Sequence, residues 1–316
     1  MTGKLRVFFT ADVHNSEAVF RKILSVPSLY KPDVIIIAGD LTGKAMVPVI
    51  EEPGGKYSAV YQGRRYRGEG EKGLLEIKRS LLDKGVYPYV TTREEVEELK
   101  QNPDKVERIF RELIVDRIRE WVQTLEEKVD PDTLVIMMPG NDDIKDVDSV
   151  IESSKRVVYP LGKTLDLGLG YKLISMDYVN PTPWNTPREV GEKELGRMLE
   201  NASKDVSEWN RVICNFHCPP YKTNIDLAPK LDKNLKPVYR FGELEMEHVG
   251  CKAVRKFMEK RRPLLGLHGH IHESEGYDRV RDTLVINPGS EYWNGVLKGV
   301  IIDLNRDGVE KWFKIG

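Results

Sequence analysis

Carboxylate, amide and imidazole side chains follow five short aliphatic segments of the chain. The segments are residues 5–10, 33–38, 133–137, 211–216 and 263–267. The polar residues after them are, in order, Asp12 and His14; Asp40; Asn141, Asp142 and Asp143; His217; and His268, His270 and His272. Five of the six histidines of the chain belong to this set. Because open α/β sheets place their sites at the carboxyl ends of the strands, we expect these side chains to gather in one place.

Metal binding is the chemistry that such a set of side chains favours. Asp12 and His14 are two residues apart, which puts them on one side of an extended chain. Mixed carboxylate, imidazole and amide ligands suit divalent manganese, iron, zinc, nickel or cobalt, and they suit calcium or magnesium poorly. Each residue alone has an ordinary alternative, since Asp12 and Asp40 could cap strands and His217 could be a buried histidine at a turn. Five matching strand ends favour the metal site.

Strands and helices alternate along the chain and must position these residues. Residues 171–177 and 283–286 predict two further strands. The early strands lack apolar–polar alternation, which indicates that both of their faces are covered. Helical patterns occupy residues 16–24, 104–128, 188–203 and 249–260. The alternation predicts an α/β sandwich, and the last residues predict a hairpin that turns at Asn305-Arg-Asp-Gly308.

Two stretches interrupt this order. Residues 45–102 contain a hairpin that turns near Gln62 and Gly63, together with helical segments. We therefore predict an insertion after the second strand, within a single domain of residues 1–316. Residues 219–247 form a long connection without strong periodicity, and connections of that length in a compact protein are usually functional or disordered.

Composition limits the partners that the protein can have. The 316 residues are 31% charged, but the net charge is −1 and the pI about 6.6, so no global basic field attracts nucleic acid or an anionic membrane. Arg64-Arg65-Tyr66-Arg67, with Tyr57 and Tyr61, could follow a phosphate backbone with base stacking, although a solvated edge or a subunit contact is the commoner reading. Three cysteines and the lack of a signal-peptide pattern predict a cytoplasmic protein. Few glutamines beside many Lys and Glu residues lean towards a thermophile.

The motifs ADVH, AGD, PGNDD, NFHCPP and HGHIH, in this order, resemble those of the calcineurin-like metallophosphoesterases. That family carries Asp-x-His, Gly-Asp, Gly-Asn-His-Asp/Glu, His and Gly-His-x-His in the same order. The resemblance extends from Leu5 to INPGS at residues 286–290, and the segment VGCKAVRKFMEKRRPLLGLHGHIHES is similar to an archaeal-type branch of predicted phosphoesterases. It implies a four-layer α-β-β-α sandwich of two mixed sheets.

The resemblance also implies a site for two divalent metal ions. One ion would be bound by Asp12, His14, Asp40 and His272, and the other by Asp40, Asn141, His217 and His270. Asp40 would then bridge two ions that, at about 3.5–4 Å apart, hold a hydroxide for in-line attack on phosphorus. Because the family's glycine precedes its first histidine, His270 and His272 are preferred as ligands over the shifted pair of His268 and His270.

One position departs from the family pattern. Asp142 stands where a histidine is thought to protonate the leaving group or hold a phosphoryl oxygen. Histidine titrates near about 6.5, whereas aspartate titrates near about 3.9 and is ionised at neutral pH. Asp142 is therefore expected to be a poor general acid, and a factor of about 10²–10⁴ in rate could be missing for poor leaving groups. We expect the metal pair to be the positive partner of Asp142 and Asp143.

Further candidate residues surround the predicted ligands. His268, Asp143, Cys218, Tyr239 and Arg240 are expected to lie behind the ligands or to contact substrate. Cys218 is expected near the metals, and Asp226, Tyr239 and Arg240 are expected as substrate contacts in the long connection. His248 is expected at the start of a helix, on the surface.

The leading hypothesis is a dinuclear phosphodiesterase or phosphatase that acts on a small phosphoester, with Asp40 and Asp142 as its catalytic carboxylates. A nuclease is an alternative, because the family includes DNA-repair nucleases, although the near-neutral charge argues against duplex binding. A third hypothesis is a non-catalytic member whose metals hold the fold while the Arg/Tyr hairpin recruits a protein. A homo-oligomer is compatible with each hypothesis, and no membrane partner is expected.

Overall fold

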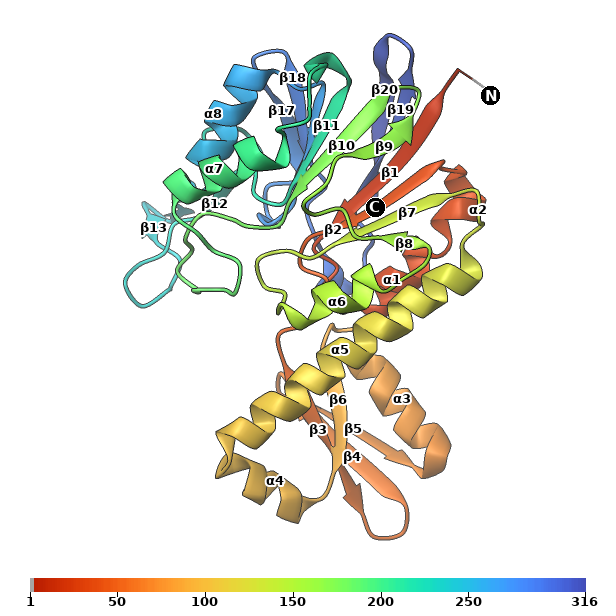
Figure 1. The fold of residues 1–316 in the computed structure, drawn as a ribbon. Helices are drawn as coiled ribbons and strands as arrows, with labels where there is room; N and C mark the ends of the chain where they lie inside the picture. Colours follow the sequence, from red (N-terminus) through yellow and green to blue (C-terminus); the bar gives the residue numbers. More distant parts are fainter. Residues whose placement is uncertain (1–2) are drawn as a thin grey trace.

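Two six-stranded mixed sheets face each other in the computed structural model, which describes residues 3–316 (Figure 1). The first sheet has the order β20-β19-β1-β2-β7-β8, with bounds Gly308–Ile315, Gly299–Asn305, Leu5–Ala11, Val34–Ala38, Leu134–Met138 and Val157–Val158. The second has the order β17-β18-β16-β11-β10-β9, with bounds Gly276–Val280, Thr283–Asn287, Leu265–Leu267, Val212–Phe216, Tyr171–Met176 and Leu165–Gly168. Every strand predicted from the aliphatic segments is confirmed, and so is the C-terminal hairpin, β19–β20.

Helices cover the outer face of each sheet. The first sheet is covered by α1 (Glu17–Ile23), α5 (Pro103–Lys128) and α6 (Asp146–Glu152), and the second by α7 (Glu192–Ala202) and α8 (Lys252–Arg261). A short helix, α2 (Val26–Tyr30), follows α1. The four predicted helices are confirmed, and their ends agree with the prediction to within four residues.

Successive residues of the central strands pack into different layers. On β1, Phe8 packs among the helices, whereas Val7 and Phe9 pack between the two sheets. On β11, Ile213 packs between the sheets and Cys214 packs against α7 and α8. Both sides of such a strand are apolar, which explains why these segments show no apolar–polar alternation. The mixed α/β sandwich predicted from the sequence is confirmed.

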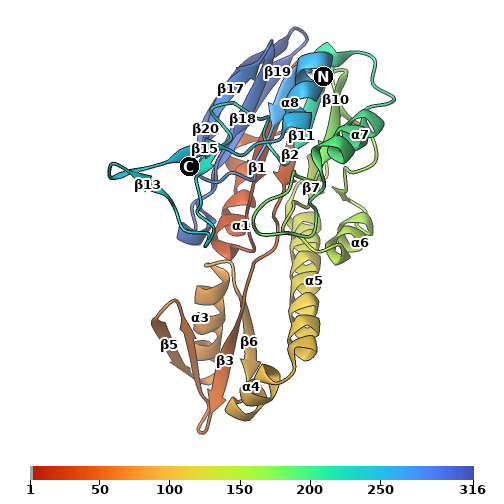
Figure 2. The same cartoon turned by 90° about the vertical axis from the view of Figure 1, so that its left-hand side faces the viewer.

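Residues 46–100 form a small lobe at one end of the molecule (Figures 1 and 2). Its four-stranded sheet has the order β5-β4-β3-β6, and α3 packs against it around a core of its own. The bounds are β3 Met46–Glu52, β4 Lys56–Tyr61, β5 Arg64–Glu69, α3 Gly70–Leu82, β6 Tyr87–Thr91 and α4 Arg93–Lys100. The lobe lies in sequence between β2 and β7, which are paired neighbours in the first sheet. The predicted hairpin at Gln62 and Gly63 is confirmed as the β4–β5 turn.

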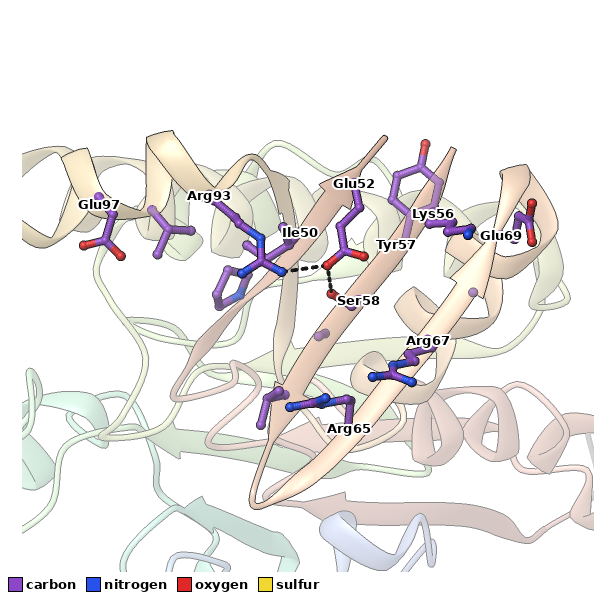
Figure 3. A pocket seen from close by; sticks show the side chains of 15 residues that line it. Ile50, Glu52, Lys56, Tyr57, Ser58, Arg65, Arg67, Glu69, Arg93 and Glu97 are labelled. Carbon is purple, nitrogen blue, oxygen red and sulfur yellow. Dashed lines mark hydrogen bonds and ion pairs between the residues drawn. The ribbon is translucent and has the colours of Figure 1, made fainter. Parts of the chain in front are cut away.

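One face of the lobe sheet is open and lines a hollow of about 940 Å³ together with α4 (Figure 3). Arg65 and Arg67 line this hollow, whereas Tyr61 and Tyr66 pack against the core on the α3 side. The arginines and these two tyrosines therefore lie on opposite faces, because neighbouring residues of a strand point to opposite sides. The remaining members of the motif do combine the two residue types, because the Arg64 guanidinium lies over the Tyr66 ring at 5.1 Å and Tyr57 lines the hollow with Arg65 and Arg67.

The long connection of residues 219–247 is built from short strands. They are β12 (Leu227–Pro229), β13 (Tyr239–Arg240), β14 (Glu243–Leu244) and β15 (Met246–His248), with β12 paired to β15 and β13 to β14. His248 thus ends a strand and does not open a helix, because the helix begins only at Lys252. Short 3-10 turns occur at Trp209–Arg211 and Tyr292–Asn294. In residues 3–316, no helix has the length and apolar character needed to cross a membrane.

Candidate metal centre

The seven predicted ligands come together where strands of both sheets end. Asp12 and His217 directly follow β1 and β11, and Asp40 follows β2 by two residues. Asn141 comes three residues after β7, and His270 three after β16. The strand ends thus deliver these side chains to one edge of the sandwich, as the sequence predicts.

One group of donor atoms is formed by Asp12, His14, Asp40 and His272. The Nε2 atoms of His14 and His272 are 3.1 Å apart. Asp40 Oδ2 is 3.7 Å from His14 Nε2, and Asp12 Oδ1 is 3.7 Å from His272 Nε2. His272 is only partly buried, so this side of the group opens towards solvent.

A second group is formed by Asp40, His217 and His270, with Asn141 beside it. His217 Nε2 is 3.3 Å from Asp40 Oδ1 and 3.0 Å from Asn141 Oδ1. The rings of His217 and His270 have centroids 5.3 Å apart. The two oxygens of Asp40 therefore face different groups, Oδ2 the first and Oδ1 the second.

The donor atoms fit divalent metal ions. Metal bonds of about 2.0–2.2 Å to nitrogen and oxygen place tetrahedral donors about 3.4 Å apart. The donor distances given above lie between 3.0 and 3.7 Å, and all donor atoms of each group lie within 4.8 Å of one another. His14 Nδ1 is 3.2 Å from the Thr42 carbonyl oxygen, so its N–H donates there and leaves the Nε2 lone pair free. Such a hydrogen bond orients a metal-binding histidine. The Asp/His clusters could hold metal.

Burial sets the protonation of the two central carboxylates. Burial raises the pKa of Asp40 to about 6, although the charge of His217 opposes the shift. Burial alone would also raise the pKa of Asp12, but the nearby imidazoles of His272 and His217 outweigh burial and hold that pKa well below its usual range. A cation between the groups would favour the charged form of both carboxylates.

The pKa values of the buried imidazoles shift in two directions. Burial lowers the pKa of His14 well below its usual value, and burial with the nearby charge of His217 lowers that of His270 to about 3. Burial also disfavours charged His217, but the Asp40 carboxylate outweighs this effect and raises the pKa of His217 to about 9. His14 and His270 are thus neutral, which is the form that binds metals, while a metal must displace a proton from His217.

The backbone at the site is bent into an unusual conformation. Four of the candidate ligands have positive φ angles: Asp12 57°, His14 40°, Asp40 42° and His270 68°. Residues other than glycine rarely adopt this left-handed region, and such strain gathers at functional sites. Glycine makes the close approach of chains feasible here, since a Cβ atom on Gly39 would lie 1.9 Å from His217 Nδ1 and one on Gly140 would lie 2.2 Å from the Asp40 nitrogen.

Asp143 joins two of the ligand-bearing loops from behind. Its carboxylate accepts hydrogen bonds from the backbone nitrogens of Leu41 (2.9 Å), Thr42 (2.8 Å) and Gly140 (2.7 Å), and from Thr42 Oγ1 (2.6 Å). It is fully buried. Asp143 therefore lies behind the ligands, which is one of the two positions that the sequence left open.

Arg188 holds the same loop from the other side and was not anticipated from the sequence. Its guanidinium is fully buried and pairs with Asp177 (2.7 Å) and Asp148 (2.6 Å). It also donates to the backbone carbonyls of Asp143 (2.8 Å) and Ile144 (2.9 Å). These bonds fix the loop that carries Asn141.

The INPGS segment closes the site near Asp12. Ser290 Oγ donates to the Asp12 carbonyl (2.7 Å), and Asn287 Nδ2 donates to the Ile271 carbonyl (2.8 Å). Tyr292, a residue that the sequence reading missed, lies against the cluster, with its ring centroid 4.6 Å from that of His14.

Asp142 has a positive partner that the sequence reading also missed. The ammonium of Lys44 forms an ion pair with its carboxylate. The expectation that a metal pair would be the positive partner of Asp142 and Asp143 is therefore corrected, since Lys44 contacts Asp142, and Asp143 is satisfied by hydrogen-bond donors. Asp142 remains at the edge of the cluster, because its backbone N–H donates to Asp40 Oδ1 (2.9 Å).

His268 and Cys218 lie behind the ligands. His268 is buried, and its Nδ1 is 2.8 Å from the Phe216 carbonyl oxygen, so it supports the end of β11. Burial lowers its pKa to about 4. Cys218 is buried next to His217, with its thiol 3.1 Å from Asn180 Oδ1.

The substrate contacts predicted in the long connection are not brought to the cluster. Tyr239 and Arg240 lie in the exposed β13–β14 ribbon, whose paired partners are Glu243 and Leu244. Asp226 is buried and organises its own loop, accepting from the Thr223 nitrogen (2.8 Å) and lying 2.7 Å from His248 Nδ1. These residues are predicted as substrate contacts only because they lie in the long connection. Tertiary packing places them away from the cluster.

Comparison of the sequence with known proteins finds a relative that matches part of the chain. No protein-family model matches the chain. The uncharacterized protein MJ1162 of Methanocaldococcus jannaschii is 31% identical over 156 residues, which cover 49% of this chain and 63% of MJ1162. The chain therefore matches less than two thirds of the length of that relative.

Solved structures align along nearly the whole chain. One crystal structure covers 99% of this chain and 100% of its own at 13% identity and a TM-score of 0.59. TT1561 of Thermus thermophilus covers 99% and 98% at 13% identity and a TM-score of 0.51. At such identities the likeness shows the fold alone. The chain is a mixed α/β protein with two facing mixed sheets, and it shares this architecture with these solved structures.

Replacing Arg188 by methionine is expected to lower the free energy of unfolding by about 3–5 kcal/mol, because the buried Asp177 and the partly buried Asp148 lose their counter-ion. Urea denaturation followed by circular dichroism measures this. Arg197→Met is the matched control, since Arg197 forms an exposed pair with Glu194, and such pairs contribute about 0–1 kcal/mol. A loss below about 1 kcal/mol for Arg188→Met would contradict the bracing role.

Metal-free protein is expected to bind Mn²⁺ or Co²⁺ and to melt at a higher temperature when it does, because an ion that binds only the folded state stabilises it by about 2.7 kcal/mol at 100 times Kd. Calorimetric titration and thermal melting measure both effects. His272→Gln should remove at least part of the binding, whereas His248→Gln, a histidine outside the cluster, should not. Equal binding by the two variants would rule out the cluster as the site.

Proposed function

We propose that the protein is a calcineurin-like metallophosphoesterase that hydrolyses a small phosphodiester or phosphomonoester with two divalent ions, drawn from Mn, Fe, Zn, Ni and Co. One observation carries the proposal: Asp40 directs its two carboxylate oxygens to two separate groups of metal-type donors. A carboxylate in this position can bridge two ions. Ions held in this way would make a nucleophile from water at neutral pH and would stabilise the leaving oxygen.

The ligands would divide into two sets, one for each ion. His14 and His272 with Asp12 would hold one ion, and His217, His270 and Asn141 the other. The half-open side of the cluster, at His270 and His272, would admit the phosphoryl group, since these two histidines are less buried than the other ligands. We further regard the chain as one phosphoesterase domain of residues 1–316, interrupted by an insertion of residues 45–102 that contains the lobe.

A small phosphoester is favoured over a long nucleic acid as the substrate. The net charge is −1, and a duplex-binding protein needs several cations to neutralise phosphates. The open face of the lobe mixes Arg65 and Arg67 with Glu69 and Glu97, so it is not a uniformly basic surface.

Metal-depleted protein resupplied with Mn²⁺, Ni²⁺, Co²⁺ or Zn²⁺ is expected to hydrolyse bis(p-nitrophenyl) phosphate, p-nitrophenyl phosphate or both. Asp40→Asn should reduce turnover by at least about 100-fold. Loss of a residue that only hydrogen-bonds to a metal ligand costs up to about 100-fold, and loss of a bridging ligand should cost at least as much. Release of p-nitrophenolate measures the rate, and the faster substrate identifies a diesterase or a monoesterase.

Asp278→Asn is a useful control, because Asp278 lies in β17 and accepts from the Asn224 nitrogen, outside the cluster. Its turnover should match that of the wild type. Absence of turnover with every metal, in wild-type protein shown to hold two ions, would contradict the proposed activity and favour a binding function.

A further inference from the structure

Lys44 brings an ammonium group to the rim of the candidate metal centre. Its ion-pair partner, Asp142, is one hydrogen bond away from the central carboxylate, since the Asp142 nitrogen donates to Asp40 Oδ1 (2.9 Å). The Lys44 side chain is 50% exposed, whereas that of Asp142 is 11% exposed. The ammonium thus faces solvent at the opening of the site, and the carboxylate lies beneath it.

The backbone around Lys44 is fixed on both sides. Before it, the Thr42 nitrogen donates to Asp143 (2.8 Å) and the Gly43 nitrogen donates to the Tyr87 hydroxyl (3.1 Å). After it, the Ala45 carbonyl accepts from the Tyr87 nitrogen (2.9 Å). The side chain therefore starts from a well-defined point between the metal centre and the lobe, and its position is set by both.

The position of the Lys44 ammonium matters because the neighbouring Asp142 carboxylate is negatively charged. A carboxylate at the opening would repel a phosphate anion, and like charges in a partly buried site cost more than in water. A lysine ammonium has three donors, so one can bind Asp142 while the others bind an oxygen of a ligand. Among residues 3–316, Asp142 is the only ion-pair partner of Lys44, which leaves the other donors free for a ligand.

We propose that Lys44 is the substrate-binding cation of this centre, binding a phosphoryl oxygen, and that Asp142 is a positioning residue that holds the ammonium at the opening. The proposal rests on the proposed phosphoesterase function and adds a specificity: Lys44 interacts more strongly with a phosphomonoester dianion than with a diester monoanion. It also gives Asp142 a role in place of the histidine that the family carries.

A purely structural role for the pair is the competing explanation. Half-exposed ion pairs contribute about 0–1 kcal/mol to stability, so loss of the pair should hardly change the folding of the protein. Phosphate binding, in contrast, should change strongly. The two explanations therefore differ in which measurement responds.

The test compares Lys44→Met, Lys44→Arg and the double variant Lys44→Met with Asp142→Asn. Calorimetric titration of the Mn²⁺-loaded protein with inorganic phosphate measures the affinity, and elemental analysis measures the metal content. Lys44→Met should bind phosphate about 10- to 100-fold more weakly, the range for a hydrogen bond to a charged group. Lys44→Arg should recover most of the affinity, and the double variant part of it, because the repelling carboxylate is gone.

Steady-state kinetics add a second readout. Lys44→Met should raise KM more than it lowers kcat, and the rise should be larger for p-nitrophenyl phosphate than for the bis ester. The matched control is Lys230→Met, since Lys230 forms a similarly exposed pair with Glu245 in the long connection. Its phosphate affinity and KM should equal those of the wild type.

Several outcomes would overturn the proposal. They are unchanged phosphate affinity in Lys44→Met, loss of bound metal in that variant, or no phosphate binding by the metal-loaded wild type. If the wild type binds metal and phosphate but hydrolyses neither ester, the phosphoesterase function fails, while the phosphate titrations still decide whether Lys44 binds the anion.

Discussion

Two buried carboxylates, Asp12 and Asp40, share one small cluster with four imidazoles, and their charge is the constraint on which the site depends. Buried charge is costly unless it is paired and hydrogen-bonded. The chain meets this need partly with its own donors, since the His270 nitrogen donates to Asp12 and the Asp142 nitrogen to Asp40. The remaining compensation comes from the imidazoles of His217 and His272, which face Asp40 and Asp12, or from a cation bound between the groups.

The surrounding fold makes this concentration of charge feasible. Loops that follow strands of both sheets must turn back sharply to aim their donors at one point, and the left-handed backbone at the ligands is the result. Such strain persists only where the surroundings fix it. Asp143 and Arg188 provide that fixation, because each binds backbone groups of the ligand-bearing loops rather than a ligand itself.

The sequence predicts the strands, the long helices and the seven candidate ligands, because each of these leaves a local pattern. An aliphatic segment ending in a polar residue marks both a strand and the place where its side chain is delivered. Lys44 and Arg188 leave no such pattern: their partners Asp142 and Asp177 are recognised only once β2, β7 and β10 are packed together. For Tyr239, Arg240 and Asp226 the prediction fails in the opposite direction. Their position in a long loop suggests contact with substrate, but the fold does not bring them to the cluster. The hydrogen bonds of residues 219–247 are formed within the segment itself, by the pairing of β12 with β15 and by the buried carboxylate of Asp226.

The helix α5 belongs to both parts of the molecule. It has 26 residues, which corresponds to about 39 Å at about 1.5 Å per residue. It packs against α4 and β6 of the lobe near its start and against α6 and the first sheet further along (Figure 2). Because one continuous helix contacts both parts, a shift of the lobe relative to the first sheet would have to bend α5 or break its contacts with α6. The lobe is therefore attached to the sandwich by packing as well as by its two chain connections.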